Sequence, residues 1–407
     1  MDSTRNRTLL GVAIGHGAHD AWYGVAPILL ASLSAGLGLA NQDIALMLLL
    51  YQSLSSITQP FFGSLAERIG GRPLAVASIL WTTLLFSGTL FVESKLLLGV
   101  LIFLAGLGSG AWHPQGTANA TMAGGARWGA TAASTFFLGG TVGSAFLGSA
   151  LGGWLLGTYD RRALLVISAI TVLLALTAVR AWVPRWLAVP KRAAANPRSA
   201  AGSGTRRAFW GLLALLLVAT ALRSFAQHAV NTFVPKFQQD MGVSPDIYGL
   251  LMSLNLFAAA LGGVAGAYLA DRVGMRRILV ITLLLGGGAL FVFMQNSSSL
   301  LGYAAFVLAG LFYGPSHTLL VVSGQRQFPD KMAMMSGFFL GFTFVSGAGG
   351  AWVLGLLADR HGLPDMLGYL PWALLLAAVF AFLALPRRDA PSPEPVPQGR
   401  VAEQPGG

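Results

Sequence analysis

The amino-acid sequence predicts an all-α polytopic membrane protein whose twelve transmembrane helices form two pseudo-symmetric six-helix halves, each built from 3+3 inverted repeats. Three observations predict this fold: the composition, the number of apolar runs and an internal repeat. Of the 407 residues, 55% are hydrophobic and 10% are charged, with a mean hydropathy of +0.66. Soluble domains carry about 25% charged residues, so we expect the lipid bilayer to be the main solvent.

Twelve apolar runs are long enough to cross a bilayer, since one helical crossing needs about 20 residues. They lack the alternation over about ten residues that marks β-barrel spans. The first run follows Arg5 and Arg7, as a secretory signal would, but it is too long for a signal and contains Asp20. The predicted spans cover residues 8–35, 44–66, 73–92, 96–120, 129–156, 163–187, 208–237, 246–270, 277–295, 299–322, 333–358 and 364–385.

A polar segment separates the first six spans from the last six. Residues 188–207 are small, basic and turn-forming, and they cannot bury enough apolar surface to fold alone. The segment is therefore predicted to be a cytoplasmic linker between an N-terminal half, residues 1–187, and a C-terminal half, residues 208–385. Residues 386–407 are rich in proline and are predicted to form a disordered cytoplasmic tail.

The distribution of basic residues predicts the orientation in the membrane. The chain has 26 Lys and Arg residues against 15 Asp and Glu, a net charge of +11. With a cytoplasmic N-terminus, 20 of the 26 lie in cytoplasmic segments, which predicts both termini in the cytoplasm and residence in the inner membrane. The basic residues therefore set topology and do not indicate nucleic-acid binding. The absence of cysteine excludes disulfides and thiolate metal sites. Separately, we expect the protein to be a monomer.

An internal repeat divides the chain into equivalent halves. Leu65–Gly70, reading LAERIG, recurs as Leu269–Gly274, reading LADRVG, at an offset of 204 residues that also places His113 on His317. A third copy, Gly355–Gly362, ends the eleventh span and indicates three-helix units within each half. Nested repeats of this kind are typical of secondary transporters, in which two halves move about a site near the bilayer midplane.

The sequence after the second span resembles the signature of the major facilitator superfamily. Gly63, Leu65, Ala66, Arg68, Gly70 and Arg72 match that signature, and Glu67 replaces its usual aspartate. The resemblance implies a cytoplasmic charge cluster that stabilises one conformation; the alternative is that these are ordinary loop charges. The cluster would contain Gly63, Glu67, Arg68, Arg72, Asp271, Arg272 and Arg276.

Within the superfamily, the chain is similar to the fosmidomycin-resistance-like group of efflux proteins. The similarity lies in His16-x-x-x-Asp20, in Gly108–Pro114 and in Leu222–Ser224. The fifth span contains Gly148–Gly153, which is similar to an element of drug:proton antiporters with Ser149 in place of a proline. The alternative for these glycines is close helix packing.

Ionisable residues within the spans are the candidates for chemistry, because charged groups are costly in a bilayer. Asp20 is the one carboxylate predicted well inside a span, and His16 lies one helical turn before it. Burial favours the neutral form of a carboxylate and a nearby cation favours the charged form. We therefore predict that Asp20 carries the coupling proton and that His16 tunes it; the alternative is a structural pair. His19 is predicted to point to a different face.

Arg223 is the one base predicted deep in a span, where it would bind an anionic group of the substrate or serve as counter-ion to Asp20. His113 and His317 are predicted in the substrate site, since each has a proline nearby that frees a backbone carbonyl. The alternative for each is a histidine that is hydrogen-bonded to a neighbouring helix. An apolar and aromatic cavity wall is expected to complete the substrate site, and this suits amphiphilic solutes. The further residues predicted in this site are Trp22, Tyr23, Trp112, Gln52, Gln227 and Asn231.

These observations predict a proton-coupled secondary transporter that exports a small amphiphilic or anionic compound by alternating access. Two alternatives are a proton-coupled uptake symporter and a receptor or scaffold that does not transport. The sequence has no phosphate-binding G-x-x-x-x-G-K-[ST] segment and no nucleophile elbow, so neither ATP-driven export nor an enzyme is predicted. The expected partners are protons, a small molecule and lipid. No cofactor or metal is expected, and the proton gradient would supply the energy.

Overall fold

The computed structural model describes residues 3–185, 206–326 and 332–385, which are mostly helical and contain no strands. The predicted tail and nearly all of the predicted linker lie outside the described residues. The first half contains α1 (Ser3–Leu37), α2 (Asn41–Ile69), α3 (Gly71–Thr89), α4 (Lys95–Val142), the π-helix η1 (Gly143–Ala150), α5 (Leu151–Thr158), the 3-10 helix η2 (Arg161–Leu164), α6 (Leu165–Leu174), the π-helix η3 (Ala175–Val179) and α7 (Arg180–Trp182).

The second half has the same number of spans and more regular helices. It contains α8 (Arg206–Asp240), α9 (Pro245–Val273), α10 (Met275–Gln295), α11 (Leu300–Arg326), α12 (Met332–His361), α13 (Leu363–Leu367) and α14 (Leu370–Ala384). Helix α8 begins two residues before the predicted start of the seventh span. The predicted all-helical, twelve-span fold is confirmed: α4 contains the fourth span and the start of the fifth, η2 to α7 form the sixth, and α13 with α14 forms the twelfth.

The boundary between the fourth and fifth spans differs from the prediction. Residues 121–128 were expected to connect the two spans, but they are helical except at Gly125, whose φ of +63° breaks α4. Glycine adopts this left-handed conformation without the steric cost that other residues incur. A single residue therefore turns the chain between the two spans.

The outer surface of the helices is apolar. Many large apolar side chains are exposed, including Ile57, Leu84 and Val264 at 76%, 65% and 68%. An exposed apolar surface of this extent is typical of a protein that contacts lipid. Nine spans in the described part of the chain are long and apolar enough to cross a membrane; α1, α2 and α3 are more polar and are not among them.

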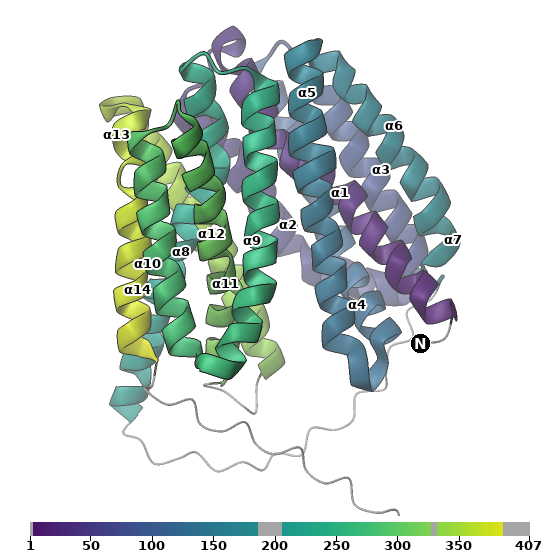
Figure 1. Ribbon diagram of the computed structural model, residues 1–407. Coiled ribbons are helices and arrows are strands. Elements are labelled where there is room, and N and C mark those ends of the chain that lie inside the picture. Colours follow the sequence, from purple (N-terminus) through teal and green to yellow (C-terminus); the bar gives the residue numbers. More distant parts are fainter. Residues whose placement is uncertain (1–2, 186–205, 327–331, 386–407) are drawn as a thin grey trace, which may run out of the picture.

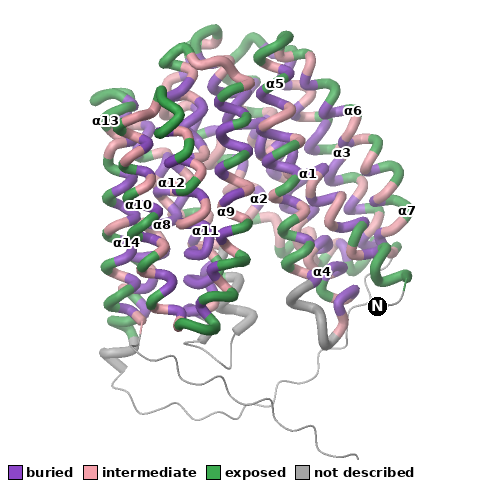
Figure 2. Tube along the Cα trace, viewed as in Figure 1, coloured by how far each residue is buried: buried purple, intermediate pink, exposed green. Residues whose placement is uncertain are grey.

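The two halves lie side by side as helical bundles (Figure 1), and exposed residues follow their outer faces (Figure 2). The bundles meet where α1 contacts α8, where α2 contacts α12, and where η1 and α5 contact α9. A Cβ atom at Gly153 would lie only 2.8 Å from the Cα of Gly249, so α5 and α9 approach backbone to backbone. This interface between the halves contains a cavity.

The three repeat copies share one backbone geometry. Each ends its helix with a glycine whose φ is positive and whose N–H donates a hydrogen bond to the carbonyl of the alanine four residues earlier. The alanine of the motif therefore supplies the acceptor, and its last glycine supplies the left-handed turn. The pairs are Gly70 with Ala66, Gly274 with Ala270, and Gly362 with Ala358, at N···O distances of 3.0, 3.0 and 2.9 Å.

Candidate functional site

Asp20 lies in the middle of α1 between two histidines of the same helix. Its Oδ2 is 3.1 Å from Nε2 of His16, and its Oδ1 is 2.9 Å from Nδ1 of His19. The carboxylate side chain is 19% exposed, whereas His16 and His19 are buried. The carboxylate of Asp20 is therefore partly accessible to solvent, although each of its oxygens lies next to a histidine nitrogen.

Helices α4 and α3 complete this cluster. The ring of His113 in α4 packs edge-on against His16 and His19, with centroids 5.1 and 5.6 Å away. Nδ1 of His113 lies 2.9 Å from the carbonyl oxygen of Ser109, and Nε2 of His19 lies 3.4 Å from Oγ1 of Thr82. We call His16, His19, Asp20 and His113 the acid–imidazole cluster.

The prediction for His19 was wrong. Adjacent helical residues point about 100° apart, which led us to expect His19 on another face. The carboxylate of Asp20 reaches back far enough to accept a hydrogen bond from the His19 ring, which also stacks on Trp112. Helical spacing alone could not find this contact, because it ignores the reach of the side chains.

The same cluster contains the donor atoms that a metal ion needs. His16, Asp20 and His113 each offer one ligand atom, and these three atoms lie within 4.8 Å of one another. A catalytic zinc ion has three protein ligands. Hydrogen bonds hold Nδ1 of His113 and Nδ1 of His16, whereas Nε2 of His16 has no hydrogen-bond partner in the structure.

The fifth span holds His16 in place. Nδ1 of His16 lies 2.8 Å from the carbonyl oxygen of Phe136, and the two rings stack with centroids 3.9 Å apart. A Cβ at Gly140 would lie 2.7 Å from His16 and 2.8 Å from Asp20, so the glycine leaves the space that this pair occupies. The glycines of this span therefore serve packing, and one of them makes room for the acid–imidazole cluster.

Arg223 lies in the second half and is buried, with 2% of its surface exposed. Its Nε donates to Oγ of Ser316 at 2.8 Å, and its Nη1 lies 3.5 Å from Nδ1 of His317. Within the described residues no carboxylate contacts this guanidinium. In this conformation Arg223 is therefore bonded within its own half, and not to Asp20.

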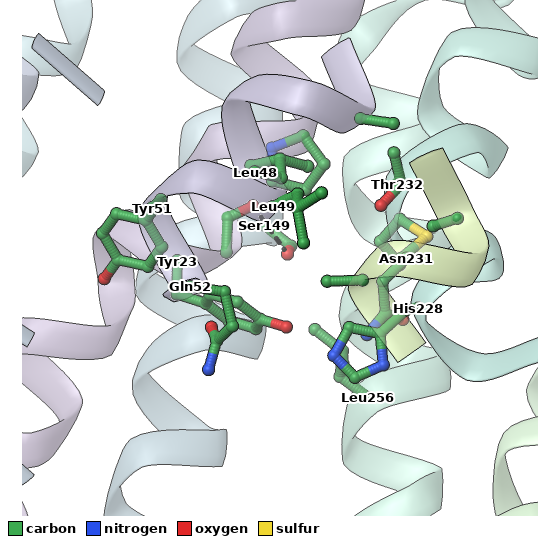
Figure 3. Close-up of a pocket in the computed structure, with 16 residues that line it drawn as sticks. Tyr23, Leu48, Leu49, Tyr51, Gln52, Ser149, His228, Asn231, Thr232 and Leu256 are labelled. Carbon is green, nitrogen blue, oxygen red and sulfur yellow. Dashed lines mark hydrogen bonds between the residues drawn. The ribbon is translucent and has the colours of Figure 1, made fainter. Parts of the chain in front are cut away.

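A cavity of about 40 Å³ lies between the halves, walled mostly by apolar side chains of α1, α2, α8, α9 and α12. Figure 3 shows Tyr23 and Gln52 on one side, facing His228 and Asn231 on the other. Nε2 of His228 and Oδ1 of Asn231 are buried without a hydrogen-bond partner, so they can bond to a solute. Small-molecule sites usually measure about 300–1,000 Å³, so the cavity must widen to admit a substrate.

Comparison with known proteins agrees with this arrangement of two bundles around a central cavity. A family model of the Major Facilitator Superfamily matches residues 14–225 and again residues 216–405. The chain belongs to the major facilitator superfamily. It is therefore a multi-pass membrane protein and a secondary transporter of a small molecule, and it is not an enzyme.

Two curated relatives match this transporter over nearly its whole length. The fosmidomycin resistance protein of Escherichia coli is 25% identical over 94% of each chain. The uncharacterised superfamily transporter YfnC of Bacillus subtilis is 27% identical over 91% of each chain. A solved structure titled as a bacterial homologue of the human lysosomal transporter Spinster has a TM-score of 0.76 at 16% identity, covering 94% of this chain and 97% of that chain. This last similarity supports the fold.

Six of the nine residues predicted in the substrate site do not line this cavity. Arg223 lies against His317 within the second half, and His113 belongs to the acid–imidazole cluster. The other three are Trp22, Trp112 and Gln227. Trp22 is fully buried, donates a hydrogen bond to Thr83 at 3.2 Å and stacks on Phe86. Trp112 is also fully buried, against the acid–imidazole cluster. Gln227 is half-buried on α8 and does not line the cavity. A tryptophan on a cavity helix packs in the core as readily as it faces a substrate, and the sequence does not distinguish the two.

The residues of the predicted charge cluster lie at the ends of α2 and α9 and the starts of α3 and α10. Glu67, Arg68 and Asp271 are exposed, and in the described part of the chain they form no ion pairs. Nε of Arg72 donates to the carbonyl of Val183 at 2.6 Å. Gly63 faces Pro114, and the guanidinium groups of Arg272 and Arg276 lie over the rings of Tyr268 and Phe382. These acids and arginines thus lie at the helix ends where the motif places them, but among the described residues they do not form ion pairs with one another.

Proposed function

We propose that this transporter exports small organic anions from the cytoplasm across the inner membrane in exchange for protons. The observation that supports the proposal is the approach of His16 to Asp20, which places an imidazole nitrogen 3.1 Å from a carboxylate oxygen, close enough for the two to share a proton. The substrate class rests separately on Arg223. The direction rests on similarity to a protein named for drug resistance.

The tautomer of His16 follows from its neighbours. The carbonyl oxygen of Phe136 can only accept, so Nδ1 of His16 carries a hydrogen. In a neutral imidazole the other nitrogen, Nε2, then has a lone pair. This nitrogen lies 3.1 Å from Oδ2 of Asp20, which is also an acceptor when ionised.

Two acceptors at this distance repel unless a hydrogen lies between them. In our proposal, a proton shared by His16 and Asp20 relieves this repulsion and is the proton that is exchanged for substrate. Loss of that proton would separate the two side chains. Because His16 joins α1 to the fifth span through the carbonyl of Phe136, proton release would be coupled to a change in helix contacts.

The anionic substrate class follows from the unpaired charge of Arg223. A guanidinium stays protonated at any physiological pH, and a buried charge is costly unless a partner of opposite sign is present. Ser316 and His317 supply hydrogen-bonding atoms but no negative charge. A carboxylate or phosphonate of the substrate would supply it once the cavity widens.

Transport by purified protein in proteoliposomes tests the proton role. We expect a proton gradient to drive flux of anions chosen from a panel of small aromatic carboxylates and phosphonates. Asp20→Asn should abolish this dependence and leave the variant able to exchange substrate at equal pH. The matched control is Asp240→Asn, which removes a 46% exposed carboxylate at the end of α8 and should leave coupling intact. Gradient-driven flux of normal pH dependence in Asp20→Asn would exclude the proton role.

The direction is tested in cells. Expression should raise resistance to the transported members of the panel, and a proton uncoupler should remove the effect. Greater sensitivity to those compounds would instead favour the uptake symporter. No effect of expression on any compound, with no flux in proteoliposomes, would favour a protein that does not transport.

A further inference from the structure

The third repeat copy, Gly355–Gly362, lies at the end of α12, away from the acid–imidazole cluster and Arg223. It has the same C-terminal hydrogen bond and the same left-handed glycine as the other two copies. Its acid, Asp359, differs from the others in what it contacts. This difference identifies a role for the motif that the proposed transport chemistry does not use.

Asp359 bonds to the first residues of α2, which belong to the other half. Its Oδ1 accepts from the backbone N–H of Asn41 at 2.8 Å and from the side-chain amide of Asn41 at 2.9 Å. Its Oδ2 accepts from the backbone N–H of Gln42 at 3.0 Å. We call these three hydrogen bonds the interbundle cap.

Asp359 supplies hydrogen-bond acceptors that the start of α2 lacks within its own half. The first N–H groups of a helix have no partner within the helix, and the helix dipole favours a negative charge at this end. Asp43 of α2 accepts from the N–H of Ala40, one residue before the helix. The N–H groups of Asn41 and Gln42 are left for Asp359, which arrives from the opposite bundle.

The glycine of the same motif copy allows this approach. A Cβ at Gly355 would lie 3.0 Å from the carbonyl oxygen of Asn41 and 3.1 Å from the Cα of Gln42. A side chain there would push α12 away from the start of α2. The glycine and the acid of the motif therefore act together, one by permitting close contact and the other by bonding.

The other copies do not make this contact. Glu67 and Asp271 are exposed, and in the described residues neither has a hydrogen bond or an ion pair. The repeat offset of 204 residues relates Asn41 to Pro245, which has no N–H, and Asp359 to Leu155, which has no polar group. The cap therefore exists at one of the two pseudo-symmetric positions.

The cap joins two of the helices that line the cavity, α2 and α12, at this end of the molecule. Ala45 of α2 and Ala351 of α12 line the cavity, roughly one to two helical turns from Asn41 and Asp359 respectively. To widen the cavity toward this end, α2 must separate from α12, and the three hydrogen bonds must break.

We propose that the interbundle cap is a conformational lock that stabilises the state closed at the end where α2 begins. It acts on the balance between conformations, whatever the substrate or coupling ion. Loss of one helix cap of this kind changes the ratio of the two conformations about fivefold, which corresponds to about 1 kcal/mol. Its removal should therefore populate the state open at this end without preventing transport.

Distance measurements between spin labels test the proposal in the full-length protein. The chain has no cysteine, so Leu96→Cys in α4 and Leu300→Cys in α11 give two label sites without background. Both residues lie at this end of the molecule, in opposite halves, and are 77% and 85% exposed. Double electron–electron resonance in lipid nanodiscs then measures the distance between the two labels and so reports the separation of the bundles.

Asp359→Ala should raise the population at long distance about fivefold. Asn41→Ala, which removes one of the three hydrogen bonds, should produce a smaller shift and serves if the first variant does not fold. The control is Asp365→Ala, which removes an exposed acid of the neighbouring α13. Unchanged distances in folded Asp359→Ala and Asn41→Ala protein would overturn the proposal. The measurement needs no substrate or pH gradient, so its result is independent of the proposed transport function.

Discussion

Arg223 is held by neutral partners, Ser316 and His317, through atoms 2.8 and 3.5 Å away. Lysine keeps the charge but loses the planar fork that binds a carboxylate or phosphonate through two hydrogen bonds. We expect Arg223→Lys to raise the KM for anions about tenfold, which corresponds to about 1.4 kcal/mol, and to leave the KM for neutral analogues unchanged. Flux assays with acids and their esters check this. Equal losses for both would instead favour a counter-ion role, with Arg277→Lys, an exposed site, as control.

Trp22 and Tyr23 are neighbours in the sequence with different surroundings. Trp22 is fully buried and bonded to Thr83, whereas Tyr23 lines the cavity. Trp22→Phe should lower the free energy of unfolding by about 2 kcal/mol, through a lost hydrogen bond and lost packing, with little effect on KM. Tyr23→Phe should change KM and leave stability nearly unchanged. Thermal denaturation in detergent and flux assays separate the two effects; the opposite pattern would contradict these assignments.

At the scale of elements, glycines determine how closely α1 approaches the fifth span. A Cβ at Gly143 would collide with the backbone of Gly17. Overpacking of this kind costs about 1–3 kcal/mol or more, so Gly143→Ala should destabilise the protein and reduce its expression. Gly349→Ala in α12 is the control, because a Cβ there meets open space and alanine favours the helix. Equal stability of the two variants would show that α1 and η1 can separate without cost.

The sequence predicted the helical elements well because their signals are local. Apolar runs near the length of a bilayer crossing located every span to within a few residues, and the repeated LAERIG and LADRVG segments located helix ends. The π-helix η1 could not be predicted, since its residues are small or apolar on every face, so a shift from i→i−4 to i→i−5 bonding changes no visible pattern. The break at Gly125 was missed for a similar reason, because one glycine among many carries no distinct signal.

The candidate site was predicted in part. His16 and Asp20 share a helix face at i and i+4, and that spacing alone brought them together. His19, the ring of Trp112 and the carbonyl of Phe136 join the site through tertiary contacts between α1, α4 and the fifth span. Such contacts depend on how helices pack, which the pattern of a single helix does not specify. The partners of Arg223, in α11, were unknown for the same reason.

At the scale of the whole molecule, the count of basic residues predicts that both termini are cytoplasmic. Helix α10 offers a direct test, since Arg277 near its start and Ser298 just after its end are both exposed. In intact cells a membrane-impermeant maleimide should label Ser298→Cys, and it should label Arg277→Cys only after permeabilisation. The native chain has no cysteine to react. The reverse labelling pattern would show that the topology is the opposite of the one predicted, and the proposed direction of transport would be reversed with it.

Gly153 and Gly249 touch across the boundary between the bundles with no side chains between them. Interlocked side chains would have to disengage before two helices could roll over each other, whereas bare backbones present a smooth surface. We therefore expect this pair to offer little resistance to rotation of α5 against α9, so that bonds at the periphery determine the activation energy of switching. Rates of interconversion should respond more strongly to changes at the rim of the molecule than to polar substitutions near this axis.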